Sequence, residues 1–152
     1  DAYNVDNPYS VSKRKAEKLV AKYSKNYLIL RPSAMLGKYS RLNSLLRIID
    51  RDCEISLSED SVMNYVLHKD IGDFIKHAIA NKLSGVFNLA AKSNIILGDA
   101  AMLVTELLGP RKIKFGGFRY NCGDIDISKV IVGGGFPIKS SQDIIEEFIK
   151  NI

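Results

Sequence analysis

The chain has 152 residues, which is enough for one compact domain with its own core and too few for two domains of ordinary length. Hydrophobic residues make up 46% and charged residues 26% of the sequence, a composition that excludes disordered and fibrous proteins. No apolar stretch approaches the roughly 20 residues that span a bilayer, and no signal pattern opens the chain, so we expect a cytoplasmic protein with no membrane partner.

The net charge of +5 comes from one segment of the chain, residues 13–25. In this segment a single acidic residue, Glu17, stands among the basic residues Lys13, Arg14, Lys15, Lys18, Lys22 and Lys25. No pattern of a nucleic-acid-binding module accompanies these charges, so the segment is typical of the solvated face of one helix. We therefore expect no nucleic-acid partner.

Alternating helical and strand patterns predict an α/β domain. A first helix is expected over residues 8–24, because Pro8 suits its first turn and apolar residues then recur at helical spacing. A short apolar run over residues 27–30 predicts a buried strand that ends before the Arg-Pro pair following it. The pattern continues with a helix over 42–50 and strands over 54–57 and 63–68.

The second half of the chain continues the alternation. Asp70 is expected to cap a helix that runs to about residue 81 and turns Phe74 and Ile79 inward. The last helix is expected to begin at a capping box formed by Ser140 and Asp143. Between these two helices the pattern predicts a strand over 86–90, a helix over 99–108 and a strand over 112–115.

The motif with chemical content is the pair Tyr9 and Lys13 on the first predicted helix. Residues four apart share one helix face, so both side chains can reach the same site. A tyrosine hydroxyl releases its proton near pH 10 in water, and an adjacent ammonium group stabilises the phenolate that proton transfer near neutrality requires. The same spacing at Tyr65 and Lys69 falls on a predicted strand, where the two residues lie roughly 13 Å apart and cannot cooperate.

The residues around the first pair resemble a known family. Residues 8–20 read PYSVSKRKAEKLV and residues 29–37 read ILRPSAMLG. They resemble the YxxSKxxxE helix and the RPxxxxG turn of extended short-chain dehydrogenases/reductases of the NAD-dependent epimerase/dehydratase kind. Residues 64–70 (NYVLHKD), 85–90 (GVFNLA) and 126–137 resemble that family's FVHVDDVA, GVYNIG and DxSKAxxLGWxP passages. The resemblance covers nearly the whole chain in one register.

This resemblance implies a fold, a chemistry and a cofactor. The fold is the C-terminal portion of a Rossmann-type doubly wound sheet with the small substrate-binding lobe, formed by residues 1–152 as one unit. Tyr9 would be the catalytic acid/base, and with Lys13 it would also contact the nicotinamide ribose of NAD or NADP. The backbone of Pro32, Ser33 and Ala34 would meet the ribose and carboxamide, and a plain strand terminus is the alternative for these three residues.

The family also implies a small-molecule substrate, a nucleotide sugar. Arg41, Asn43 and Arg119 are the candidates for contacts to it, and helix capping is the alternative for Arg41 and Asn43. Two positions depart from the family: Leu36 stands where a tyrosine is common, and Met63 stands where an arginine grips the substrate phosphate. By analogy with the family, a homodimer that pairs through the first helix is also expected.

No metal site is expected from the histidines and cysteines. Cys53 and Cys122 lie far apart, without metal-ligand spacing or the pattern of a disulfide framework, so free thiols are expected. His68 and His77 fall on a predicted strand and a predicted helix without partner residues, so both are expected to be structural.

Two features that dinucleotide binding requires do not occur in the sequence. No GxGxxG or GxxGxxG turn follows a strand, and the family's catalytic Ser or Thr would precede Asp1. We therefore expect a fragment that lacks the N-terminal dinucleotide-binding half and is inactive by itself. The whole enzyme would be an epimerase, dehydratase or reductase. The alternative is a non-catalytic binding or regulatory relative, which the intact pair of Tyr9 and Lys13 disfavours.

Overall fold

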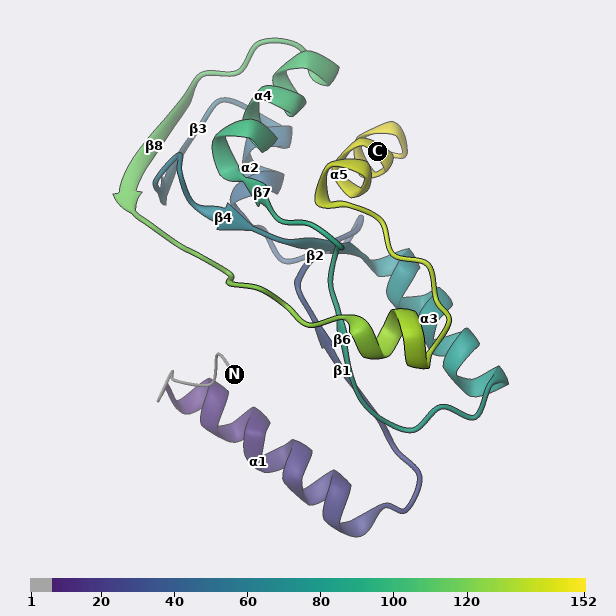
Figure 1. Ribbon diagram of the computed structural model, residues 1–152. Helices are drawn as coiled ribbons and strands as arrows, with labels where there is room; N and C mark the ends of the chain where they lie inside the picture. Colours follow the sequence, from purple (N-terminus) through teal and green to yellow (C-terminus); the bar gives the residue numbers. More distant parts are fainter. Residues whose placement is uncertain (1–6) are drawn as a thin grey trace.

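The computed structural model describes residues 7–152 and shows helices packed against pairs of short strands (Figure 1). The helices are α1 (Pro8–Tyr23), α2 (Ser44–Asp50), α3 (His68–Ala80), α4 (Leu97–Leu108) and α5 (Ser141–Lys150), with a short π-helix η1 (Lys129–Gly133). The strands are β1 (Leu28–Pro32), β2 (Ala34–Leu36), β3 (Cys53–Leu57), β4 (Val62–Met63), β5 (Tyr65–Leu67), β6 (Gly85–Leu89), β7 (Ile95–Ile96) and β8 (Ile113–Phe118). The α/β class predicted from the sequence is confirmed.

Strands that are far apart in the sequence pair in parallel. The parallel pairs are β1–β6, β2–β5 and β3–β8, whereas β4–β7 is antiparallel. Parallel neighbours need a long crossover, and helices α2 and α3 lie in the crossover that separates β1 from β6. The alternation of strands and helices in the sequence therefore becomes a parallel α/β arrangement.

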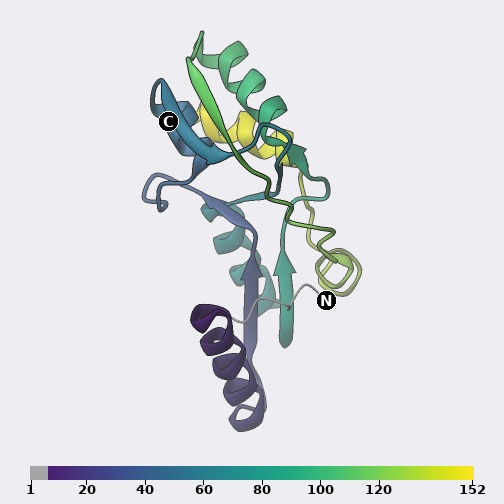
Figure 2. The ribbon, with the colours of Figure 1, turned by 90° about the vertical axis from the view of Figure 1, so that its left-hand side faces the viewer.

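The molecule is elongated and has two lobes, each with a core of its own (Figure 2). The lower lobe contains α1, β1, β6, α3 and η1, and its core includes the buried side chains of Phe74, Phe87 and Val130. The upper lobe contains α2, β3, β8, α4 and α5, and its larger core includes Leu45 and Ile145. The chain passes from β1 to β2 where the two lobes meet.

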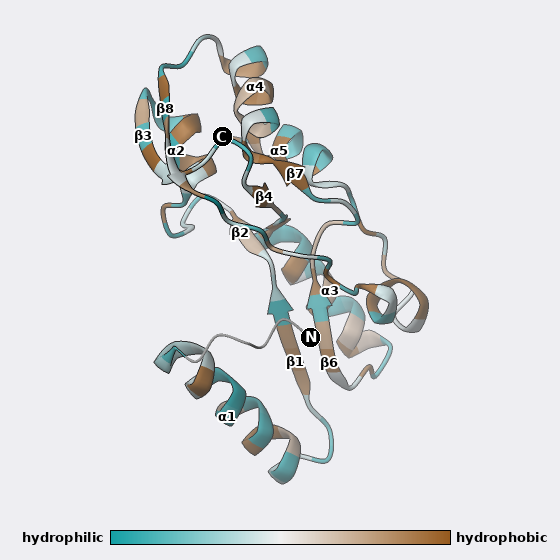
Figure 3. Cartoon of the chain, turned by 60° about the vertical axis from the view of Figure 1, so that its left-hand side comes forward, coloured by the Kyte–Doolittle hydropathy of each residue, from teal (hydrophilic) through white to brown (hydrophobic). Residues whose placement is uncertain are grey.

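Helix α1 differs from the other α-helices because none of its side chains is buried among residues 7–152. Its surface is mostly hydrophilic, and it lies beside the apolar strand β1 at the edge of the lower lobe (Figure 3). Leu19 and Tyr23 are 55% and 74% exposed on this helix. Within residues 7–152, α1 is therefore held by polar contacts and by its connection to β1.

Several details of the predicted elements are wrong. The strand expected over 63–68 is two strands, β4 and β5, which pair with different partners, and His68 belongs to α3 instead. Strand β1 continues through Arg31 to Pro32, the register partner of Leu89. Among the described residues β1 pairs only with β6, and proline is tolerated in a strand that is paired on one side. Asp70 does not cap α3: the helix begins at His68, so Asp70 lies in its first turn, where it accepts hydrogen bonds from Lys139. Ile79 is 71% exposed, since it lies about 100° around the helix from the buried Ala78.

The capping box predicted for the last helix is confirmed. Ser140 is the N-cap of α5, its hydroxyl accepts from the backbone N–H of Asp143, and the Asp143 carboxylate accepts from the backbone N–H of Ser140. The Ser140 hydroxyl also donates to the Asp143 carboxylate, and this hydrogen bond, followed by the one from the backbone N–H of Ser140, lowers the pKa of Asp143 because both stabilise the ionised form. The helix buries its apolar face against the core of the upper lobe, as the spacing of its apolar residues predicts.

Adjacent glycines in β8 give a matched test of packing in the β3–β8 pair. A Cβ atom added to Gly116 would lie 2.7 Å from the carbonyl carbon of Ser56, whereas a Cβ on Gly117 would meet nothing within 4 Å. We expect Gly116→Ala to lower the free energy of unfolding by about 1–3 kcal/mol, because backbone atoms must move apart. Gly117→Ala should change it by less than about 0.5 kcal/mol in the same urea titration. Equal effects of the two substitutions would contradict this reading of the packing.

Candidate active site

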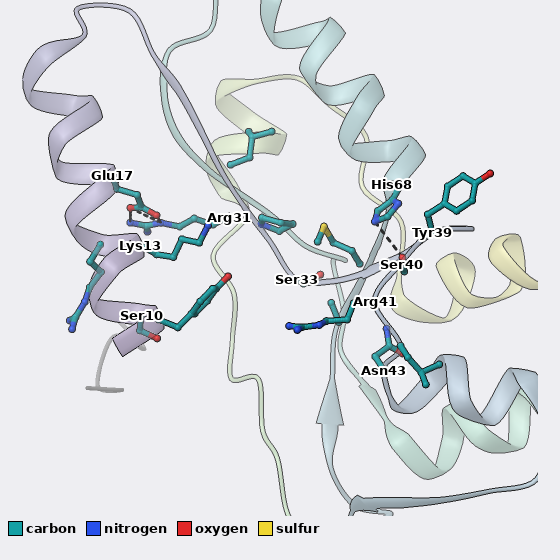
Figure 4. A pocket seen from close by; sticks show the side chains of 17 residues that line it. Ser10, Lys13, Glu17, Arg31, Ser33, Tyr39, Ser40, Arg41, Asn43 and His68 are labelled. Atoms are coloured by element: carbon teal, nitrogen blue, oxygen red, sulfur yellow. Dashed lines mark hydrogen bonds and ion pairs between the residues drawn. The ribbon is translucent and has the colours of Figure 1, made fainter. Parts of the chain in front are cut away.

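A cleft of about 840 Å³ lies between α1, the carboxyl end of β1 and the loop of residues 37–43 (Figure 4). Three segments supply its predicted site residues. Tyr9 and Lys13 come from α1, residues 32–34 come from the β1–β2 junction, and Arg41 and Asn43 come from the loop. Most of the residues singled out from the sequence therefore line one cavity.

On α1 the tyrosine and the lysine of the motif are neighbours. Asn7 caps the helix, because its side-chain oxygen accepts from the backbone N–H of Ser10 at 2.8 Å. Pro8 is the first helical residue, so Tyr9 and Lys13 fall on consecutive turns of one face. The Lys13 ammonium lies 5.6 Å from the centre of the Tyr9 ring. Tyr9 is 70% exposed, which leaves its ring accessible to a ligand in the cleft.

The junction of β1 and β2 is held rigidly by the backbone of the neighbouring strands. The N–H of Ser33 donates to the carbonyl of Leu89 at 2.9 Å, and the N–H of Ala34 donates to the carbonyl of Asn64 at 3.1 Å. The side chain of the buried Asn64 in turn bonds to both the N–H and the carbonyl of Ala91. The Ser33 hydroxyl is buried and has no hydrogen-bond partner among residues 7–152. Buried polar groups are normally hydrogen-bonded, and the Ser33 hydroxyl is an unsatisfied buried polar group at the cleft.

The loop of residues 37–43 is fixed by a histidine that the sequence interpretation assigned only a structural role. A Cβ atom on Gly37 would lie 2.7 Å from Cγ of His68, so only glycine allows this ring to pack so closely. The Nε2 atom of His68 lies 3.3 Å from the hydroxyl of Ser40, and both residues line the cleft. Nothing in the local sequence signals this contact, because the two residues are 28 positions apart.

The polar residues of the loop differ in what they contact. Asn43 is the N-cap of α2, where its side-chain oxygen accepts from the backbone N–H of Leu46 at 3.0 Å, so the capping alternative describes its observed contact. Arg41 extends across the cleft toward α1 (Figure 4) and has no ion-pair partner among the described residues. Arg41 is thus the member of this pair that is available to a ligand.

Arg119 does not line the cleft. Its guanidinium group pairs with the carboxylate of Asp60 at 3.0 Å, and both side chains are largely exposed. The second Tyr-x-x-x-Lys pair is also elsewhere: Tyr65 is completely buried in β5, and burial raises the pKa of its hydroxyl, while Lys69 is paired with Asp73 on α3. The structure thus gives this second pair no common site.

An ion pair that the sequence interpretation did not single out lines the cleft and joins α1 to β1. The Arg31 guanidinium binds the Glu17 carboxylate with two nitrogens, Nε at 3.0 Å from Oε1 and Nη2 at 2.5 Å from Oε2 (Figure 4). Glu17 lies one turn beyond Lys13 on the same face of α1. This i, i+4 spacing was the sequence signal that could have placed the Glu17 carboxylate beside the motif.

Within residues 7–152 no group of three or more His, Cys, Asp or Glu side chains is placed to hold a metal ion. Cys53 and Cys122 are free thiols. None of the helices formed by these residues is long and apolar enough to cross a membrane.

Comparison with known proteins identifies the fold. No family model and no curated protein matches the sequence, but many solved structures match the structure of this chain. A UDP-glucuronic acid 4-epimerase from Bacillus cereus, in complex with UDP-glucuronic acid and NAD, matches with a TM-score of 0.75 and 22% identity. The chain has the fold of nucleotide-sugar epimerases and reductases. The match covers 95% of this chain and 53% of the epimerase.

Two further matches have the same fold. An ADP-L-glycero-D-manno-heptose-6-epimerase from Helicobacter pylori has a TM-score of 0.79 and 16% identity, over 96% of this chain and 50% of the epimerase. A dTDP-4-dehydrorhamnose reductase from Bacillus anthracis in complex with NADP has a TM-score of 0.78 and 18% identity, over 95% of this chain and 55% of the reductase. The chain thus spans about half the length of these enzymes. The predicted Rossmann-type fold is confirmed, whereas the organisation of residues 1–152 as one unit stays a prediction.

Proposed function

We propose that the chain is the C-terminal half of an extended short-chain dehydrogenase/reductase that uses NAD or NADP to transform a nucleotide sugar. The observation that carries the proposal is the placement of Tyr9 and Lys13 beside the carboxyl end of β1 in one cleft. In open parallel α/β sheets, ligands bind outside the carboxyl ends of the strands. The solved enzymes of the same fold include complexes with NAD, with NADP and with UDP-glucuronic acid.

The residues of the cleft fit a nicotinamide riboside. The orphaned hydroxyl of Ser33 and the exposed ammonium of Lys13 offer hydrogen-bonding groups to a ribose or a carboxamide at the strand end. When bound, the nicotinamide supplies the acceptor or donor of hydride. Tyr9 takes the proton of the sugar hydroxyl as that carbon is oxidised and returns it when the carbonyl is reduced, while the Lys13 charge stabilises the phenolate.

The charge of the cleft suits an anionic substrate. Arg41 and Lys13 line the cavity, and the carboxylate of Glu17 is already held by Arg31. Guanidinium groups bind phosphate oxygens with paired hydrogen bonds, so Arg41 is the proposed contact to the diphosphate of a nucleotide sugar. Asn43 borders the same cavity and orients the loop that carries Arg41.

The exposed apolar residues of α1 favour pairing with another surface. Leu19, Val20 and Tyr23 are uncovered by the described residues, and we include a homodimer through this helix in the proposal. A non-catalytic relative is disfavoured, since the acid/base tyrosine and its lysine are both present and adjacent. Whether the reaction is an epimerisation, a dehydration or a reduction depends on the substrate.

Cofactor binding by the whole protein tests the proposal. We expect Lys13→Met to weaken binding of NADH or NADPH roughly tenfold to hundredfold, because one hydrogen bond from a charged group to the ribose is lost. Titration of the nicotinamide fluorescence measures this change. Lys18→Met is the matched control, because Lys18 lies on the same helix outside the cleft. Equal cofactor affinities of the two variants would reject the proposed role of Lys13.

A further inference from the structure

Helix α1 carries the two proposed catalytic side chains in its first two turns, far from the segment that connects the helix to β1. The chain continues from Tyr23 through residues 24–27 into β1, so this end of the helix is tied to the sheet. Tyr9 lies 14 residues earlier, about 21 Å along the helix axis. A rotation of the helix by only about 10° around its tied end would therefore move Tyr9 by roughly 4 Å.

Packing of buried side chains does not prevent such a rotation, since α1 buries none among the described residues. A bidentate ion pair of Glu17 and Arg31 joins α1 to β1 among the described residues. Their side chains are only 24% and 35% exposed, whereas those of the surface pair Asp50 and Arg51 are 62% and 81% exposed. A partly buried, bidentate pair fixes geometry better than an exposed one.

The pair also connects the two halves of the proposed site directly. Glu17 follows Lys13 by one turn on the same helix face, and Arg31 directly precedes the segment 32–34 at the strand end. Holding Glu17 on Arg31 therefore fixes the distance of Tyr9 and Lys13 from that strand end. Displacements of about 1 Å can cost a hundredfold in rate, so this distance matters to the chemistry.

We propose that Glu17 and Arg31 are positioning residues, whose ion pair holds the catalytic face of α1 over the carboxyl end of β1. The catalytic consequence rests on the proposed function, whereas the positioning of the helix does not. Neither side chain has to touch substrate or cofactor in this role. The pair acts through Lys13 and Tyr9.

Hydrogen exchange and steady-state kinetics of the whole protein test the proposal together. We expect Glu17→Gln to raise amide exchange rates in α1 about fivefold without changing those in α5. In the same variant kcat should fall roughly tenfold, while KM and the cofactor Kd stay within about twofold. The exchanged pair, Glu17→Arg with Arg31→Glu, should recover most of both losses, because it restores the ion pair in reverse.

Glu106→Gln is the matched control, since Glu106 is an exposed glutamate of α4 with no ion pair among residues 7–152. Exchange rates of α1 that are the same in Glu17→Gln and Glu106→Gln would overturn the proposal. A loss that also appears in α5 and that the exchanged pair does not recover would overturn it too. If the unsubstituted protein shows no turnover but the exchange pattern is found, the proposed function fails while the positioning of α1 stands.

Discussion

Tyr9→Phe should lower kcat of the whole protein by about a thousandfold or more and leave the cofactor Kd within about threefold. The substitution removes one oxygen, so the ring still occupies its place beside Lys13, but no group remains to take or return the hydroxyl proton. Loss of a positioned acid/base typically costs about 100- to 10,000-fold. Steady-state conversion of the substrate, together with cofactor titration, measures the two effects separately.

Tyr23→Phe is the control for this experiment. Tyr23 lies on the same helix, is 74% exposed, and has the ammonium of Lys22 at 5.1 Å from its ring centre, but it does not line the cleft. Its loss of a hydroxyl should leave kcat within about twofold. Turnover that survives in Tyr9→Phe would remove Tyr9 from the mechanism, whatever the effect at Tyr23.

Phe74→Ala should give a large loss of stability, about 3–5 kcal/mol in the free energy of unfolding. Phe74 is fully buried in the core of the lower lobe, where its ring centre lies 5.3 Å from those of both Phe87 and Phe136. Removing the ring leaves a cavity between α3, β6 and the turn before α5, and few other buried side chains are available to fill it. Urea unfolding followed by circular dichroism measures the change.

Phe118→Ala provides the comparison for Phe74→Ala. Phe118 ends β8 and is 64% exposed, so its truncation should cost less than about 1 kcal/mol. A cost below 1 kcal/mol for Phe74→Ala as well would show that the lower lobe does not depend on the aromatic cluster.

The sequence predicts elements well where the signal is local. The capping box of Ser140 and Asp143 and the proline near the start of α1 depend on neighbours within four residues, and both helices begin where these signals predict. The strands β2 and β7, with three and two residues, are too short to produce an apolar period and were not predicted. The π-helix η1 was missed for the same reason, since its five residues are too few to show a helical period.

The candidate site shows the same division between local and tertiary information. Tyr9 and Lys13 are brought together by helix geometry alone, so their spacing in the sequence was enough to predict that the two side chains are neighbours. The contact of Ser40 with His68 and the pairing of Arg119 with Asp60 join segments that the sequence does not show to be close. The resemblance to a family placed Arg119 with the substrate contacts, whereas in the structure this residue lies outside the cleft.

A turnover assay on the whole protein tests the central claim most directly. The protein is incubated with NAD or NADP and a panel of UDP-, dTDP- and ADP-linked hexoses, and the products are separated and identified by mass spectrometry and NMR. The proposed function predicts conversion of at least one nucleotide sugar, with the conversion lost in Tyr9→Phe and kept in Tyr23→Phe. Conversion that Tyr9→Phe retains, or a panel that stays unchanged while the protein binds neither dinucleotide, would contradict it.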